Sequence, residues 1–197
     1  PKFGVCIMEF DSPGIGQILK AGGAEYIFVD TEHSGFGIDT LKRLLRYMQA
    51  ADIPAFVRPP SQNADHIATA LDAGAEGLML PMVSSAAEAA AIVAAMKYPP
   101  VGRRGVAIGI AHDRYLPSSP AEALAAANDR TVCIALIETA AAIADIDAIA
   151  AVPGLDMLWV GHFDLSTSLG IPGQFDHPDF NAAVEQVIKA AQSNDLS

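Results

Sequence analysis

Short apolar segments alternate with longer amphipathic segments along the whole chain. The apolar segments are nearly continuous in Val, Ile, Leu and Met, which is typical of parallel strands that are buried on both faces. Six segments have this pattern: residues 4–10, 25–30, 54–59, 77–82, 131–138 and 156–165. Helical periodicity predicts helices at residues 13–23, 38–52, 63–74, 86–99, 138–152 and 177–193.

A repeated strand–helix unit is compatible with a doubly wound sheet or with a (β/α)₈ barrel. A doubly wound nucleotide-binding fold would carry a glycine-rich turn after its first strand, but the sequence there is EFDSPGIG, without G-x-G-x-x-G spacing. We therefore expect an α/β fold of the (β/α)₈ TIM barrel class. Residues 1–197 would form a single barrel domain with about six of the eight βα units. Either the last two units lie outside this chain, or the barrel prediction fails.

The composition excludes several classes of partner. A net charge of −11 argues against nucleic acid and against anionic membrane surfaces. No apolar run approaches the roughly 20 residues of a membrane span, and we expect a cytoplasmic protein. Cys6 and Cys133 lie in apolar runs, and we expect two buried thiols rather than a disulfide.

Polar side chains gather where the predicted strands end. Because the carboxyl ends of barrel strands face one mouth, such residues are expected to form one site. Five of the six strands contribute to this group: Glu9 follows the first, Asp30, Glu32 and His33 the second, Arg58 the third, Glu138 the fifth, and His162 and Asp164 the sixth.

This set has the chemistry of an enolate site. Glu138 and Asp164, on neighbouring strands, form an oxygen pair of the kind that divalent cations favour. Arg58 offers a planar guanidinium to a substrate carboxylate, and His33 is suited to proton transfer near neutral pH. Together with a metal ion, they could bind a 2-oxo acid and stabilise its enolate. Asp30 and Glu32 are expected to orient His33 or Arg58.

The chain resembles the class II, metal-dependent pyruvate aldolases of the HpcH/HpaI aldolase/citrate lyase family, over nearly its whole length. This family includes 4-hydroxy-2-oxoheptanedioate and 2-keto-3-deoxy-sugar-acid aldolases. The matching motifs, in order, are DTEH (30–33), FVRP (56–59), LDAGAEGLMLPMV (71–83), KYPPVGRRG (97–105), LIET (136–139) and VGHFDLSTSLG (160–170).

The resemblance implies a barrel of the phosphoenolpyruvate/pyruvate type, assembled as a hexamer of paired subunits. It implies that Glu138 and Asp164 hold Mg²⁺, Mn²⁺ or Co²⁺, which chelates pyruvate. Arg58 would steady the enolate and the developing alkoxide, and His33 would serve the proton transfers. The implied reaction is reversible cleavage of a 4-hydroxy-2-oxo acid into pyruvate, or a related 2-oxo acid, and an aldehyde.

The resemblance also implies that Asp72 raises the basicity of His33. Asp72 is predicted near the carboxyl end of a helix, where a negative charge opposes the helix dipole and faces away from the strand ends. We therefore expect that Asp72 could reach His33 only from a neighbouring subunit. A solvated carboxylate at the helix end is the alternative, and Glu32 is the next candidate partner for His33.

The chain differs from many members of this family at two positions that are expected to contact the substrate. Many relatives have Gly-Pro where this chain has Gly161-His162, and many have Gln where Leu136 stands. His162 is expected to supply a substrate donor in place of that Gln, so the expected substrate-binding residues are Arg58, Leu136, His162 and Phe163. Trp159 and Phe163 are expected in the core or in a pocket wall.

Other polar residues have weaker functional interpretations. His66, His112 and His177 are expected at the surface or as helix caps. Arg103 and Arg104 could bind a distal carboxylate or form a structural salt bridge. Two further functions stay open: an acyl-CoA lyase of the citryl- or malyl-CoA type, and a non-catalytic barrel subunit.

Overall fold

The computed structural model describes residues 2–197, which form two compact units. The first unit comprises residues up to 79 together with 95–131, and the second comprises 80–94 together with 132–197. The boundary between the units falls within β4. The expectation of a single domain over residues 1–197 stays a prediction.

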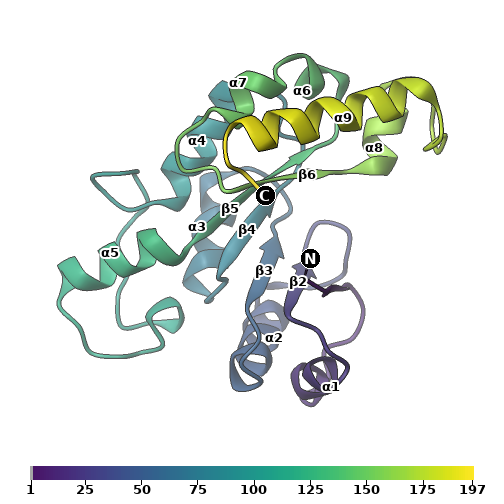
Figure 1. The fold of residues 1–197 in the computed structure, drawn as a ribbon. Helices are drawn as coiled ribbons and strands as arrows, with labels where there is room; N and C mark the ends of the chain where they lie inside the picture. Colours follow the sequence, from purple (N-terminus) through teal and green to yellow (C-terminus); the bar gives the residue numbers. More distant parts are fainter. Residues whose placement is uncertain (1) are drawn as a thin grey trace. The chain divides into compact units, whose positions relative to one another are not determined.

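All six predicted strands are present, each shorter than its apolar segment. The strands are β1 (Gly4–Ile7), β2 (Tyr26–Asp30), β3 (Ala55–Arg58), β4 (Gly77–Leu80), β5 (Val132–Ile137) and β6 (Met157–Val160). The helices are α1 (Ile15–Ala21), α2 (Ile38–Ala50), α3 (Ala64–Asp72), α4 (Ala86–Met96), α5 (Pro120–Arg130), α6 (Ala140–Ala144), α7 (Ile146–Ala150), α8 (His162–Ser168) and α9 (Pro178–Ser193). A short 3₁₀ helix, η1, covers Ala111–Asp113. Figure 1 shows this alternation of strands and helices along the chain.

The first unit contains parallel strands that pair in chain order from β1 to β4. The register places Phe28 beside Phe56 and Asp30 beside Arg58. Since side chains alternate between the two faces of a strand, Phe28 and Asp30 share one face. The rings of Phe28 and Phe56 are 5.4 Å apart, so an aromatic layer leads to the Asp30–Arg58 pair at the carboxyl ends of β2 and β3.

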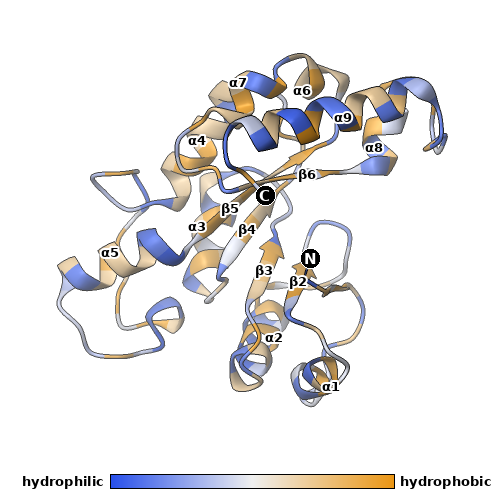
Figure 2. Ribbon diagram, viewed as in Figure 1, coloured by the Kyte–Doolittle hydropathy of each residue, from blue (hydrophilic) through white to orange (hydrophobic). Residues whose placement is uncertain are grey.

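Helix α2 shows why the amphipathic segments fold as helices. Its buried residues are Leu41, Leu44, Leu45 and Met48, which repeat at helical spacing along one face. The strands are more uniformly apolar, as the orange β2 and β3 in Figure 2 show.

The second unit pairs β5 with β6 in parallel, with Leu136 beside Trp159. Helix α9 packs against α7 and β6. It begins at Pro178, where the His177 side chain accepts a hydrogen bond from the Asp179 N–H. This confirms the capping role expected of His177 and the helix predicted over residues 177–193.

Two predicted boundaries were wrong. The helix predicted over 138–152 is divided at Asp145, whose carboxylate accepts the Ala86 N–H at 2.8 Å. The strand predicted over 156–165 ends at Val160, and the Leu165 N–H donates to the Gly161 carbonyl in the first turn of α8. The alternation of Phe163 and Leu165 resembles a strand, but Phe163 is exposed and Leu165 is buried on a helix.

Cys6 is also a correction. Cys133 is buried as expected, whereas Cys6 is exposed, and both are free thiols. Cys6 lies on β1, the terminal strand of the observed strand order, so β2 covers only one edge of its strand. Over residues 2–197, no helix is long and apolar enough to cross a membrane.

Candidate active site

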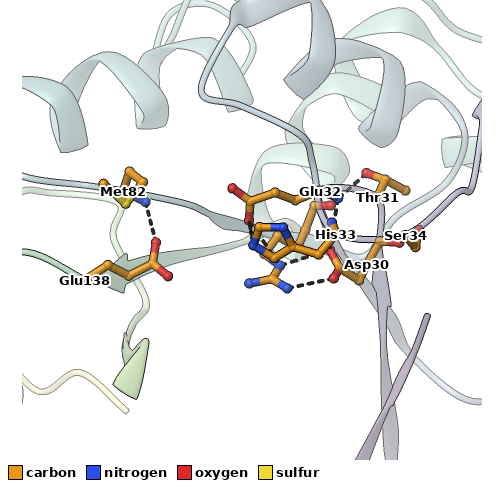
Figure 3. A network of polar contacts seen from close by, with 8 residues as sticks. Asp30, Thr31, Glu32, His33, Ser34, Met82 and Glu138 are labelled. Carbon is orange, nitrogen blue, oxygen red and sulfur yellow. Dashed lines mark hydrogen bonds and ion pairs between the residues drawn. The ribbon is translucent and has the colours of Figure 1, made fainter. Parts of the chain in front are cut away.

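The carboxyl ends of β2 and β3 carry a buried ion pair. The Arg58 Nε donates to Asp30 Oδ1 at 3.0 Å, and its Nη2 donates to Asp30 Oδ2 at 2.7 Å. Asp30 is 1% exposed, and the Arg58 side chain is 19% exposed. Figure 3 shows Asp30 close to Glu32 and His33. The expectation that Asp30 orients Arg58 is confirmed, and the two-point contact fixes the plane of the guanidinium.

Glu32 and His33 adjoin this pair. The Glu32 Oε2 lies 3.4 Å from Arg58 Nε and 3.6 Å from His33 Nε2. Asp30 Oδ1 also accepts the backbone N–H groups of Glu32 and His33. The His33 side chain is 58% exposed and can therefore meet a ligand or solvent. The structure thus brings Asp30, Glu32, His33 and Arg58 together, with Glu32 as the carboxylate next to His33.

The pKa values of the pair follow from these contacts. Burial works to raise the pKa of Asp30, but the hydrogen bonds from Arg58 and from the Glu32 backbone outweigh it, so the pKa lies below its ordinary value. Burial works to lower the pKa of Arg58, but Asp30 and Glu32 raise it above its ordinary value. Both groups are therefore charged over the whole physiological range.

This shift predicts how stability depends on pH. Because the pKa of Asp30 is lower in the folded protein, Asp30 stabilises the fold fully above its ordinary value of 3.8, and that contribution is lost as the pH falls through the folded value. Asp30→Asn should flatten the fall in urea midpoint between about pH 4 and pH 2. Asp11→Asn, which alters an exposed ion pair, is the control, and equal slopes for both variants would contradict this account.

Glu138 follows β5 in the second unit and is 4% exposed. Its Oε2 accepts the Met82 N–H at 2.8 Å, as Figure 3 shows. Met82 has a φ of +57°, which is uncommon for a residue other than glycine and costs on the order of 1 kcal/mol. This strained backbone directs an N–H to the carboxylate, so Glu138 is held in one orientation.

Gly161 lies against the other side of the same carboxylate. A Cβ at this position would lie 2.5 Å from both Cγ and Oε1 of Glu138. The Gly161 N–H donates to the Ile137 carbonyl, which fixes the loop after β6 to the end of β5. Only glycine therefore leaves Glu138 its observed position.

Gly161→Ala should displace Glu138 and weaken divalent-ion binding by about 10- to 100-fold, as expected when the support of a ligand is lost. Titration calorimetry with Mn²⁺ measures this. Gly105→Ala is the matched control, because a Cβ at Gly105 meets nothing within 4 Å. Equal Mn²⁺ affinity in the two variants would show that Gly161 does not position the carboxylate.

Asp164 lies in the first turn of α8 and is exposed. It was expected at a strand end, but it stands on a helix, where its charge is favourable near the amino end of the helix dipole. Among residues 2–197, no three His, Cys, Asp or Glu side chains form a metal-binding group. The pairing of Glu138 and Asp164 as metal ligands stays a prediction.

Asp72 is the last residue of α3, and its Oδ1 pairs with Nη2 of Arg104. The Arg104 side chain is 2% exposed, and its guanidinium also lies 4.5 Å from the centre of the Tyr98 ring. This confirms the structural salt bridge considered for Arg104, while Arg103 is exposed. A contact of Asp72 with His33 of a second subunit stays a prediction.

The expected substrate-binding residues of the second unit differ in exposure. Leu136 is 2% exposed, so its side chain belongs to the core around β5. His162 and Phe163 are exposed, and their rings are 4.5 Å apart. Phe163 is 64% exposed and Trp159 is 38% exposed, so neither lies in the core, and the alternative position in a pocket wall stays a prediction.

His112 is another correction, because it was expected at the surface or as a cap and is 5% exposed. Its Nε2 lies against the Ala107 carbonyl and 3.3 Å from the Tyr98 hydroxyl. His66 is exposed as expected, and its Nδ1 contacts the Ser61 hydroxyl at 2.8 Å.

Two parts of the site are made by the backbone, and the sequence contains little sign of either. The Met82 N–H and the missing Cβ of Gly161 both position Glu138, but neither residue carries a reactive side chain. The one available signal for Gly161 was its position inside the strand predicted over residues 156–165, because a glycine within a strand often marks a close approach of a neighbouring group.

Comparison with known proteins identifies the family of this chain. The sequence profile of the HpcH/HpaI aldolase/citrate lyase family matches residues 6–197. The hydroxypyruvate/pyruvate aldolase of Sagittula stellata is 38% identical over 89% of this chain and 68% of its own length. The 2-keto-3-deoxy-L-rhamnonate aldolase of Klebsiella pneumoniae is 34% identical over 89% of this chain and 65% of its own. The chain thus spans about two thirds of the length of these relatives.

The crystal structure of an HpcH/HpaI aldolase from Desulfitobacterium hafniense is 36% identical and has a TM-score of 0.93, with 99% of this chain and 75% of that chain covered. Fold and sequence define a class of α/β enzymes of the TIM barrel type, as predicted. The chain belongs to the HpcH/HpaI aldolase/citrate lyase family.

Proposed function

We propose that the protein is a metal-dependent aldolase that reversibly cleaves a 4-hydroxy-2-oxo acid into pyruvate, or a related 2-oxo acid, and an aldehyde. The observation that carries the proposal is the restrained carboxylate of Glu138, held by the Met82 N–H and by the close approach of Gly161, in a chain whose relatives are named as aldolases.

Glu138 and Asp164 would hold the divalent ion, Mg²⁺, Mn²⁺ or Co²⁺. Such an ion would supply the positive charge that makes the 2-oxo group a better electron acceptor during cleavage. The rest of the chemistry belongs to this chain. Arg58, held in plane by Asp30, would keep N–H groups available to the substrate carboxylate or to the developing oxyanion.

In the cleavage direction, a base takes the proton of the C4 hydroxyl, the C3–C4 bond breaks, and the aldehyde leaves. The exposed imidazole of His33 is proposed for this proton transfer. Glu32, 3.6 Å from His33 Nε2, would stabilise the imidazolium that results. Protonation of the enolate at C3 then yields the 2-oxo acid.

His162 and Phe163 are proposed to line the aldehyde side of the site. Both are exposed, and they directly precede Asp164 in the first turn of α8. A catalytic contribution of Asp72, assembly into a hexamer of paired subunits and a cytoplasmic location stay predictions.

The test is pyruvate release from 4-hydroxy-2-oxo acids, coupled to lactate dehydrogenase, with Mg²⁺, Mn²⁺ or Co²⁺ and with EDTA. Citryl-CoA and malyl-CoA serve as the alternative substrates. Metal-dependent release from the hydroxy-oxo acids supports the proposal. Release that survives EDTA, or cleavage of the acyl-CoA substrates alone, would refute it.

A further inference from the structure

The first unit contains a cavity at the opposite end of its strands from Asp30 and Arg58. It has a volume of about 290 Å³ and lies beside the amino ends of β3 and β4. Its apolar wall consists of small and aliphatic side chains from α2 and the strand starts, among them Leu45, Met48, Ile53, Ala55 and Ala75. Its polar rim consists of Gln49, Asp52, Glu76, His112, Arg114 and Arg130, so two carboxylates accompany the two arginines.

The polar rim has more hydrogen-bond donors than acceptors. Glu76 lies 3.6 Å from Arg130 Nε and 3.8 Å from Arg114 Nη2, so one carboxylate serves two guanidinium groups at distances longer than a direct hydrogen bond. Each guanidinium carries five N–H donors. One Arg130 donor is used by the His112 carbonyl. The two arginines therefore keep donors that a further anion can accept.

Residues next to the rim add further hydrogen-bonding groups that lack a partner in the part of the chain that the structure describes. Arg46, whose Nη2 donates to the Ala73 carbonyl, packs against Gly74 of the cavity wall and has a buried Nε with no hydrogen-bond partner in residues 2–197. His112 Nδ1 is likewise buried without a partner among the described residues. In a protein with a net charge of −11, this gathering of three arginines is a local exception.

The backbone holds Arg114 at the cavity. Arg114 and Tyr115 both have a φ of +59°, the left-handed region that residues other than glycine rarely occupy. Two such residues in succession strain the backbone, and this kind of strain clusters at binding sites.

We infer that this cavity binds a small carboxylate with an apolar body. The carboxylate takes the free donors of Arg114 and Arg130, and the body packs on Leu45, Met48 and Ala75. The volume suits an acid of a few carbon atoms. This site is separate from the proposed aldolase chemistry and does not depend on it.

The test follows the alanine methyl signals of the full chain by NMR, in EDTA, during titration with isobutyrate. The methyl groups of Ala55, Ala75 and Ala111 line the cavity and should shift together along a saturable curve. The Ala183 methyl on α9 is the internal reference. Isobutyramide, which has the same shape without the charge, should produce no saturable shift.

Variants of the rim should change the affinity in opposite directions. Arg114→Gln should weaken isobutyrate binding about tenfold, as expected for one lost charge-assisted hydrogen bond. Glu76→Gln should tighten binding several-fold, because it removes the competing carboxylate. Arg103→Gln, an exposed arginine that does not line the cavity, should change nothing.

The inference is overturned if the three methyl signals do not saturate, if isobutyramide binds equally well, or if Arg114→Gln binds as tightly as the parent protein. Because Arg114 is 59% exposed, its substitution should leave the fold intact, and the Glu76→Gln result provides an independent check of opposite sign.

Discussion

Glu138→Gln is expected to lower the rate of metal-dependent aldol cleavage roughly a thousandfold while the protein stays folded. The amide retains an oxygen that can accept the Met82 N–H, and it occupies nearly the same volume beside Gly161. What it loses is the negative charge that binds a divalent ion. The lactate dehydrogenase-coupled assay measures the rate, and circular dichroism measures the fold.

Glu88→Gln is the matched control. Glu88 also accepts a backbone N–H, from Ser84 at 2.8 Å, and it lies in the same unit on α4. Its substitution should leave activity within about twofold of the parent, as is usual for a surface change away from the site. If Glu138→Gln retained parental activity, Glu138 could not be a ligand of the catalytic ion.

Arg58→Met is expected to destabilise the protein by about 3–5 kcal/mol, the usual cost of removing one partner of a buried ion pair. Asp30, which is 1% exposed, would be left charged without its counterion. Activity should fall as well, because the proposed oxyanion donor is gone. Urea denaturation at pH 7 measures the free energy of unfolding.

Two further variants separate stability from chemistry. Arg43→Met breaks the exposed pair with Asp11 and should cost less than about 1 kcal/mol. The double variant Asp30→Asn/Arg58→Met should regain much of the lost stability, because no charge is left buried, and it should remain inactive. An active double variant would show that Arg58 has only a structural role.

The sequence was most informative where a residue's role depends on position along one strand. The apolar pattern located β2 and β3, so Asp30 and Arg58 could be assigned to strand ends before any partner was known. Their mutual contact depends on the register of β2 against β3, which the sequence does not specify because both strands are apolar on both faces.

Asp164 and Asp72 show where sequence patterns are insufficient. The alternation Phe163–Leu165 mimics a strand, and only the hydrogen bond from Leu165 to Gly161 starts a helix there. Asp72 lies at the helix end where the sequence placed it, but its partner Arg104 is 32 residues away and is set by tertiary packing. Such long-range pairs are fixed by the fold as a whole and leave no local signal.

The central claim is that this protein forms the enolate of a 2-oxo acid with a divalent ion held by Glu138. Exchange of the pyruvate methyl protons with D₂O, followed by ¹H NMR, tests it without requiring the correct aldehyde. We predict exchange that needs both protein and Mg²⁺ or Mn²⁺ and that disappears with EDTA or with Glu138→Gln. Exchange no faster than in metal-containing buffer alone, or equal exchange by the Glu138→Gln variant, would contradict the account.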